Sequence, residues 1–268
     1  MNKQALIDAI FEKKSLLCVG LDTDIEKLPE GIEKNMKGLL AFNQNIIEAT
    51  QKYAVAYKVN TAFYEQYGSE GWACLEETLK AIPKDCFSIA DAKRGDIGNT
   101  SSMYAKAFFK HMQFDAITVA PYMGEDSLSP FFQFKDKWVI CLGLTSNAGS
   151  KDFQVLNVGQ RPLYLEVMHK VSQWGNDEQL MFVTGATKAS DLKTLREAFP
   201  NHFFLVPGVG AQGGTVKEVC DNALTDFGGL LINASRSILY ASSGLDYIEK
   251  ASEEAKKLQG ECQLAMGL

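Results

Sequence analysis

Residues 20–32 read GLDTDIEKLPEGI and form the first turn after an apolar run at 16–22. In an open α/β sheet that binds a dinucleotide, this turn carries a glycine-rich GxGxxG sequence, which brings the backbone close to the pyrophosphate. The segment contains no GxGxxG, and an aspartate, Asp22, closes the apolar run instead. The first turn therefore argues against a dinucleotide-binding sheet.

Apolar runs alternate with helical patterns along almost the whole chain. The runs are continuously hydrophobic, as is typical of parallel strands that are covered on both faces. They are eight in number and lie at 16–22, 55–60, 87–94, 116–121, 139–145, 180–186, 202–210 and 229–236. Helical spacing of apolar residues marks 38–52, 71–81, 100–112, 162–174, 189–199 and 214–223. Such a series predicts a closed barrel or a doubly wound open sheet. The first turn favours the α/β class with a (β/α)8, or TIM, barrel.

The length and composition are those of an ordinary globular chain. At 268 residues, of which 46% are hydrophobic and 22% charged, the chain is long enough for one barrel. Two smaller domains are also compatible with this length. We expect a single barrel domain over residues 1–268, with an N-terminal helix at about 2–14 and a closing helix at about 244–258.

Charge, cysteine usage and targeting signals exclude several classes of protein. The net charge is −6 without a run of Lys or Arg, so we expect no nucleic-acid partner. The segment MNKQALIDAIFEKK lacks the apolar core of a signal peptide, and no apolar stretch reaches membrane-spanning length. The six cysteines form no CxxC pair, which favours buried free thiols over zinc. We expect a cytoplasmic protein that contacts no membrane.

Ionisable side chains gather where the predicted strands end. They are Asp22 after the first strand, Lys58 in the second, Asp91 and Lys93 in the third, and Asp96 just beyond. The neutral Asn60 lies near Lys58 in the second strand. Because side chains alternate along a strand, Lys58 and Asn60 share a face, as do Asp91 and Lys93. Reactive groups of a (β/α)8 barrel lie at the carboxyl ends of its strands. The sequence therefore predicts a charged pocket at this end of the barrel.

An ion network that merely closes the barrel would use the same residue types, because buried charges are usually paired. Two lysines with up to three carboxylates on three successive strands exceed what such a closure needs. Charge clusters of this density are typical of catalytic sites, where neighbouring groups restrain each other's protonation. We therefore favour a catalytic role for the cluster.

The last two strands lead into a predicted anion site. The segment PGVGAQGG at 207–214 is a glycine-rich turn before a helix, where backbone N–H groups attract an anion. Arg236, at the end of the next strand, adds a bidentate partner. The loops after strands seven and eight are the recurrent phosphate site of this barrel class. Glycines that only permit tight turns are the alternative, but Gln212 and Arg236 favour phosphate binding.

The stretch DAKRGDIGNT at 91–100 resembles the DxKxxDIxxT signature of the orotidine 5'-monophosphate decarboxylase family. Other stretches similar to that family are GLDTD, YKVNTAFYEQYG, TVAPYMGEDSL, LTSNAGS, LVPGVGAQGG and NASRSILYAS. KRGDI and PYMGEDSL look most like its bacterial type 2 branch, and the resemblance covers about residues 16–242. The Asp-x-Lys-x-x-Asp core is shared with sugar-phosphate enzymes of the wider superfamily. Ile97, Thr100, Gln212 and Arg236 in register make the match specific.

The resemblance implies a decarboxylase that converts orotidine 5'-monophosphate (OMP) into uridine 5'-monophosphate (UMP) and carbon dioxide. Lys93 would protonate C6 of the pyrimidine, and Asp91 would lie against the substrate carboxylate. Lys58 would hold the charged groups in place. Asp96, Ile97 and Thr100 would reach into the site of the partner subunit, so a homodimer is expected.

The remaining matches imply contacts with the rest of the nucleotide. Asp22 would bind the ribose hydroxyls, a role that Asn60 would share, and Ser146 would bind the pyrimidine ring. Gln212 and Arg236 would bind the phosphate. Ser235 stands where shorter members of the family usually carry glycine, and its backbone N–H would serve equally well.

Direct decarboxylation at C6 leaves an electron pair that the ring does not delocalise, so the barrier is very high. The sequence carries no cofactor fingerprint, and we expect no cofactor and no metal, with fixed electrostatics doing the catalysis. A metal-dependent relative acting on a keto sugar phosphate, with the aspartates as Mg²⁺ ligands, is the nearest alternative. A non-catalytic nucleotide-binding barrel is the second.

Overall fold

A computed structural model describes residues 1–185, 189–208 and 214–268 of the chain. Its centre is a closed barrel of parallel strands in the order β1, β2, β3, β4, β5, β8, β9 and β10, with β10 pairing back onto β1. Their bounds are β1 Leu17–Gly20, β2 Ala56–Asn60, β3 Phe87–Arg94, β4 Ala116–Val119, β5 Trp138–Leu144, β8 Leu180–Thr184, β9 Phe203–Pro207 and β10 Leu230–Ala234. The (β/α)8 prediction is confirmed, and each predicted strand overlaps one strand of the barrel.

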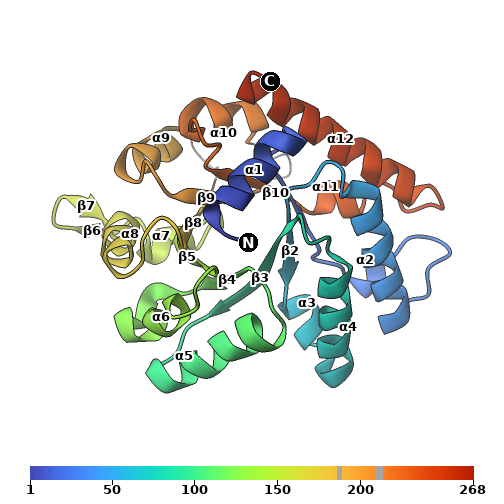
Figure 1. The fold of residues 1–268 in the computed structure, drawn as a ribbon, viewed down its shortest axis with the longest axis horizontal. Coiled ribbons are helices and arrows are strands. Elements are labelled where there is room, and N and C mark those ends of the chain that lie inside the picture. Colours follow the sequence, from blue (N-terminus) through green and yellow to red (C-terminus); the bar gives the residue numbers. More distant parts are fainter. Residues whose placement is uncertain (186–188, 209–213) are drawn as a thin grey trace.

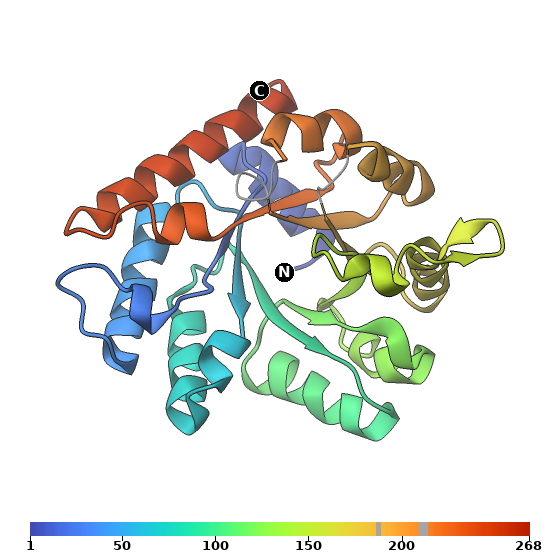
Figure 2. The same ribbon diagram turned by 180° about the vertical axis from the view of Figure 1, so that it is seen from behind.

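Helices form a ring around the barrel (Figures 1 and 2). Their bounds are α1 Lys3–Lys13, α2 Met36–Thr50, α3 Ala62–Glu65, α4 Gly68–Ala81, α5 Gly98–Ala105, α6 Glu125–Phe132, α7 Ser150–Phe153, α8 Leu163–Trp174, α9 Ala189–Ala198, α10 Val216–Ala223, α11 Arg236–Leu239 and α12 Tyr247–Met266. A π-helical turn, Lys106–His111, prolongs α5, and 3-10 turns lie at Ile25–Lys27 and Pro121–Met123.

Two elements differ from the expectation. The closing helix α12 does not end at about 258 but continues to Met266, and it begins at Tyr247 rather than at 244. A small antiparallel hairpin, β6 Asn157–Val158 and β7 Arg161–Pro162, stands out from the barrel between α7 and α8. Its strands are too short and too exposed to leave an apolar pattern in the sequence.

Aromatic side chains fill the barrel at the amino ends of its strands. The Trp138 ring packs edge-on against Phe87 and Phe203, with ring centroids 6.0 and 5.9 Å apart. These residues open β5, β3 and β9, which are not neighbours in the barrel, so the rings meet across its interior. Helix α1 lies over this end of the barrel (Figure 1), where the Trp138 Nε1 donates to the Met1 carbonyl at 2.9 Å. The opposite, carboxyl end is the one left open for a ligand.

All six cysteines are free and buried, as predicted. Burial raises the pKa of the Cys18, Cys220 and Cys262 thiols to about 12, which keeps them protonated and unreactive. Within the ranges that the structure describes, no helix combines the length and the apolar character that crossing a membrane requires.

Candidate active site

A cavity of about 540 Å³ opens at the carboxyl ends of the barrel strands. One wall, from β1, β2 and β3, is charged and polar: Asp22, Lys58, Asn60, Asp91 and Lys93. The facing wall, from β5, β8 and β9, is apolar: Leu142, Val183, Leu205 and Pro207. Small-molecule sites have volumes of roughly 300–1,000 Å³ and combine these two kinds of lining. The cavity therefore has the size and the polarity of a ligand site.

Strand β3 is irregular where it carries its two charged residues. Ala90 pairs with Ile117 of β4, and Arg94 pairs with Val119, so four steps along β3 face two steps along β4. Within this bulge Lys93 has φ 48°, a left-handed conformation that costs a side-chain-bearing residue roughly 1–2 kcal/mol. The sequence prediction placed Asp91 and Lys93 on one face of a regular strand. In the structure, the bulge brings the Lys93 side chain back towards Asp91.

Thr118 of β4 supplies the hydrogen bonds that this bulge needs. Its hydroxyl accepts from the Lys93 backbone N–H at 2.9 Å and donates to Asp91 Oδ1 at 3.0 Å. The side chain is 1% exposed, so no water competes for these bonds. Thr118 thereby ties the strained backbone of Lys93 to the carboxylate that Lys93 contacts.

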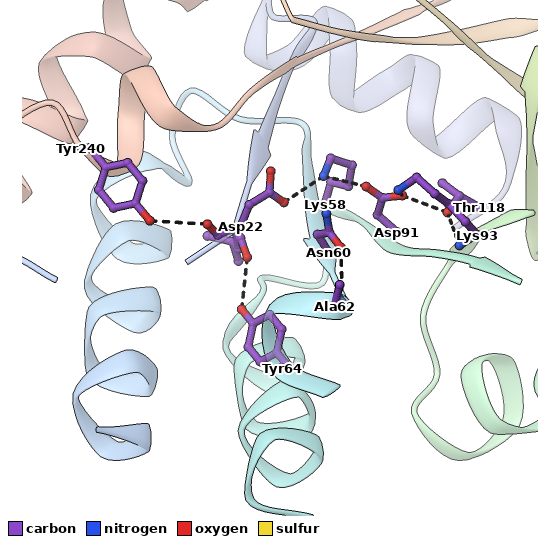
Figure 3. A network of polar contacts seen from close by, with 10 residues as sticks. Asp22, Lys58, Asn60, Ala62, Tyr64, Asp91, Lys93, Thr118 and Tyr240 are labelled. Carbon is purple, nitrogen blue, oxygen red and sulfur yellow. Dashed lines mark hydrogen bonds and ion pairs between the residues drawn. The ribbon is translucent and has the colours of Figure 1, made fainter. Parts of the chain in front are cut away.

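The charged residues form one continuous chain of ion pairs (Figure 3). Lys93 Nζ lies 2.6 Å from Asp91 Oδ1, and Asp91 Oδ2 lies 3.1 Å from Lys58 Nζ. Lys58 Nζ also lies 3.0 Å from Asp22 Oδ1. The Lys58 side chain is 6% exposed and that of Lys93 is 48% exposed. Lys58 is thus the buried cation of the array, and Lys93 is the ammonium group at its accessible end.

The two most buried members of the array keep their charges. Burial by itself raises the pKa of the Asp91 carboxyl, but Lys58 and Lys93 outweigh burial and hold this pKa well below its usual value. Burial lowers the pKa of the Lys58 ammonium, but Asp91 and Asp22 outweigh it and hold this pKa above its usual value. The site therefore presents fixed, opposite charges over the whole neutral range of pH.

Two tyrosines fix the loop that carries Asp22 (Figure 3). The Tyr240 hydroxyl accepts from the Asp24 backbone N–H at 2.9 Å and donates to the Asp22 carbonyl at 3.5 Å. The Tyr64 hydroxyl donates to the Leu21 carbonyl at 3.3 Å. Because residues 21–24 at the start of the first turn are held in this way, Asp22 stays beside Lys58.

The other predicted ligand contacts surround the same cavity. Asn60, Ser146, Ser235 and Arg236 all line it, and Arg236 begins α11 directly after β10. Ser146 lies tightly over Gly185, because a Cβ atom at 185 would come within 2.8 Å of the Ser146 nitrogen. Gln212 lies outside the described residues, as does most of the glycine-rich turn.

Asp96, Ile97 and Thr100 do not line the described cavity of their own chain. The Asp96 carboxylate accepts from the Ile97 backbone N–H at 2.7 Å and makes no ion pair with either lysine of the array within the described residues. Ile97 is 61% exposed, although it is a large apolar residue, and Thr100 is exposed as well. Within one chain, the array consists of Asp22, Lys58, Asp91 and Lys93.

Comparison with known proteins identifies the family. The model of the "Orotidine 5'-phosphate decarboxylase / HUMPS family" matches residues 15–265. The chain belongs to this family. It is 50% identical to the orotidine 5'-phosphate decarboxylase of Phocaeicola vulgatus, over 99% of both chains. It is 52% identical to the protein of the same name from Flavobacterium johnsoniae, over 97% of both chains.

Solved structures agree with this family assignment. The OMP decarboxylase of Leishmania donovani is 39% identical and matches 97% of this chain and 99% of its own, with a TM-score of 0.82. A putative orotidine-monophosphate-decarboxylase of Toxoplasma gondii is 32% identical over 99% of this chain and 98% of its own, with a TM-score of 0.87. The barrel fold is thus shared with proteins named as decarboxylases of this family.

Several residues of the cavity and the array were not predicted from the sequence, and Thr118, Gln154 and Asn233 are the most informative of them. Thr118 bridges Asp91 and Lys93, Gln154 lines the cavity from the segment after β5, and Asn233 lines it from β10. Asn233 is 7% exposed, and its Oδ1 has no hydrogen-bond partner among the described residues. A polar residue inside an otherwise apolar strand was the available signal for Thr118 and Asn233. Gln154 lies in a loop and gave none.

Proposed function

We propose that this chain decarboxylates OMP to UMP and carbon dioxide in pyrimidine biosynthesis, without a cofactor. The observation that carries the proposal is the ion-pair chain ending in Lys93, 2.6 Å from Asp91, at a cavity of about 540 Å³. Relatives of the same length, about half identical, are named orotidine 5'-phosphate decarboxylase. They support this reaction over that of the sugar-phosphate members of the wider superfamily.

The reaction needs a positive charge that is in place before the bond breaks. Loss of carbon dioxide leaves an electron pair at C6, and the enzyme must supply stabilisation near the upper end of about 8–23 kcal/mol. The Lys93 ammonium supplies a charge next to that electron pair and then the proton that C6 takes up. Because Asp91 already orients the ammonium group, little reorganisation is needed during the reaction.

Asp91 and Lys58 give the array its fixed geometry. Asp91 accepts hydrogen bonds from Lys58, Lys93 and Thr118, so its carboxylate is held ionised and has little freedom to turn away. It would lie against the substrate carboxylate, and the repulsion between the two groups would vanish when carbon dioxide leaves. Lys58 holds Asp91 and Asp22 at a constant separation.

The rest of the nucleotide would extend across the cavity. Asp22 and Asn60 would bind the ribose hydroxyls, Ser146 would bind the pyrimidine ring, and the backbone of Ser235 with the side chain of Arg236 would bind the phosphate, together with Gln212. Arg236 lines the cavity, and no acidic side chain of the described residues forms an ion pair with it, so its guanidinium group is available to a phosphate. Binding energy at this remote end would help to close the site and exclude water.

A homodimer in the cytoplasm completes the proposal. Asp96, Ile97 and Thr100 would enter the site of the partner subunit, where Asp96 would face Lys93 from the other side. Their position supports this role: they follow β3 directly, they do not line their own cavity, and Ile97 exposes an apolar side chain. Size-exclusion chromatography with light scattering tests the dimer.

The reaction is tested by mixing the purified protein with OMP and following the fall in ultraviolet absorbance, with and without EDTA. We expect rapid conversion to UMP that EDTA leaves unchanged. Loss of activity in EDTA would favour the metal-dependent alternative, for which a keto sugar phosphate is the next substrate to try. Tight binding of UMP without turnover would favour a binding-only barrel.

The role of Lys93 is tested separately with Lys93→Ala. This variant is expected to lose turnover while it still binds UMP, as measured by calorimetry. The control is Lys84→Ala, which removes an exposed lysine before the other end of β3 and should leave the rate unchanged. Retention of more than about a tenth of the wild-type rate by Lys93→Ala, which corresponds to less than ~1.4 kcal/mol, would show that Lys93 is not the proton donor.

A further inference from the structure

Gln154 stands apart from the other residues of the segment between β5 and α8. It directly follows α7 and is half-buried, whereas nearly every other residue of 147–161 is exposed. Its side chain lines the cavity. Among the described residues, it is also the one side chain of 148–160 that hydrogen-bonds to the end of β5. The contacts of this segment with the site thus converge on one carboxamide.

Both ends of that carboxamide bind Thr145. Its Oε1 accepts from the Thr145 backbone N–H at 2.8 Å, and its Nε2 donates to Thr145 Oγ1 at 2.8 Å. The Thr145 hydroxyl in turn donates to Asn147 Oδ1 at 2.6 Å. A flipped carboxamide would place an NH₂ group against an N–H donor, so the orientation is unambiguous. Gln154 and Thr145 thus form a hydrogen-bonded ring, and Thr145 is joined across Ser146 to Asn147.

Ser146 is also held by a close contact with Gly185. Gly185, just after β8, leaves no room for a side chain, because its Cβ would lie 2.8 Å from the Ser146 nitrogen and 3.0 Å from its Cα. The Gly185 N–H also donates to the Leu144 carbonyl at 2.6 Å. The backbone at Ser146 is thus held by Gly185 and, through Thr145, by Gln154, and Ser146 lines the cavity.

From this geometry we propose that Gln154 is a positioning residue, which holds the 145–147 turn so that Ser146 meets the pyrimidine ring of the substrate. The proposal rests on the function proposed above, in which Ser146 binds that ring. Gln154 acts through Thr145 and the backbone of Ser146. Its removal should therefore weaken recognition of the base and leave the phosphate end of the nucleotide unaffected.

The test uses Gln154→Leu, which keeps the size of the side chain but makes no hydrogen bond. Its matched control is Gln160→Leu, an exposed glutamine of the same segment outside the cavity. Affinity is measured by calorimetry for two ligands, UMP and ribose 5-phosphate. Loss of two neutral hydrogen bonds predicts an affinity of Gln154→Leu for UMP that is weaker by about fivefold or more, with ribose 5-phosphate within twofold of wild type. Gln160→Leu should match wild type with both ligands.

A double-mutant cycle separates positioning from a merely structural role. If Gln154 acts through Ser146, Gln154→Leu should have little further effect on KM for OMP in a Ser146→Ala background. Additive effects of the two changes overturn the proposal. So does equal weakening of UMP and ribose 5-phosphate, which would indicate a general collapse of the cavity. A wild-type protein that does not decarboxylate OMP would refute the proposed function instead, and the two binding measurements would still report on Gln154.

Discussion

Replacement of Lys58 by methionine removes the buried cation of the array and keeps a side chain of similar length. Lys58 joins Asp22 at 3.0 Å to Asp91 at 3.1 Å, with only 6% of its side chain exposed. Without it, two carboxylates face each other across a space that little water enters. We expect Lys58→Met to fold less stably and to lose activity, because the array then carries two negative charges against the single positive charge of Lys93.

The size of the effect follows from what remains bound to each carboxylate. Removal of one partner from a buried ion pair costs about 3–5 kcal/mol. Asp91 keeps its bonds to Lys93 and Thr118, and the Asp22 side chain is 22% exposed, so both carboxylates are partly compensated. The lower end of the range, about 3 kcal/mol, is therefore expected. For a chain of this size, such a loss lowers the melting temperature by about 6–12 °C.

The assay is thermal unfolding by circular dichroism beside steady-state kinetics with OMP. Lys3→Met is the matched control, because Lys3 also joins two carboxylates, Asp177 at 2.5 Å and Glu178 at 3.4 Å. These two acids are 34% and 63% exposed and lie outside the cavity, so the control should cost about 1 kcal/mol or less and leave kcat unchanged. A melting temperature of Lys58→Met within 2 °C of that of Lys3→Met would refute the reasoning.

Three further predictions concern other parts of the site. Arg236→Ala should raise KM for OMP at least tenfold with an unchanged circular dichroism spectrum, and an unchanged KM would place the phosphate elsewhere. Thr118→Val should lower kcat and destabilise the fold by about 1–3 kcal/mol, measured by urea unfolding, because Asp91 and the Lys93 N–H lose a buried partner; wild-type kcat would contradict this. Burial raises the pKa of Asp91, but Lys58 and Lys93 outweigh burial and hold this pKa below its unfolded value of about 3.9. The ionised Asp91 therefore stabilises the fold fully above about pH 4, and this contribution is lost as the pH falls further. The melting temperature should therefore fall more steeply between pH 4 and 2 in the wild type than in Asp91→Asn, and parallel curves would rule out this linkage.

The barrel could be predicted from the sequence because each strand is buried on both faces and therefore appears as an apolar run. The charged array was equally visible, because Asp22, Lys58, Asp91 and Lys93 interrupt those runs at their carboxyl ends. The bulge in β3 was not visible. Extra residues in one strand change its pairing with β4 but not the order of apolar and polar residues.

The end of α12 and the position of Gln154 could not be predicted either, for similar physical reasons. Helix α12 continues past 258 because Cys262 is 1% exposed and anchors its last turns, while Gly260, a weak helix former, faces open space. Gln154 owes its place in the site to a loop whose course no periodic pattern encodes. Residues held by tertiary hydrogen bonds alone, as Gln154 is by Thr145, leave no trace in local sequence.

The left-handed backbone of Lys93 has an evolutionary consequence. The residues that adopt φ 48° most easily are glycine and asparagine, and neither carries an ammonium group. With the role proposed for Lys93, a lineage that keeps the reaction would have to retain a lysine at a position where the backbone disfavours it. In a lineage that imports its pyrimidines, selection for the lysine ceases while selection for a stable barrel continues. Position 93 is where such a lineage should diverge first, and glycine or asparagine there would mark a descendant that has abandoned the chemistry but kept the fold.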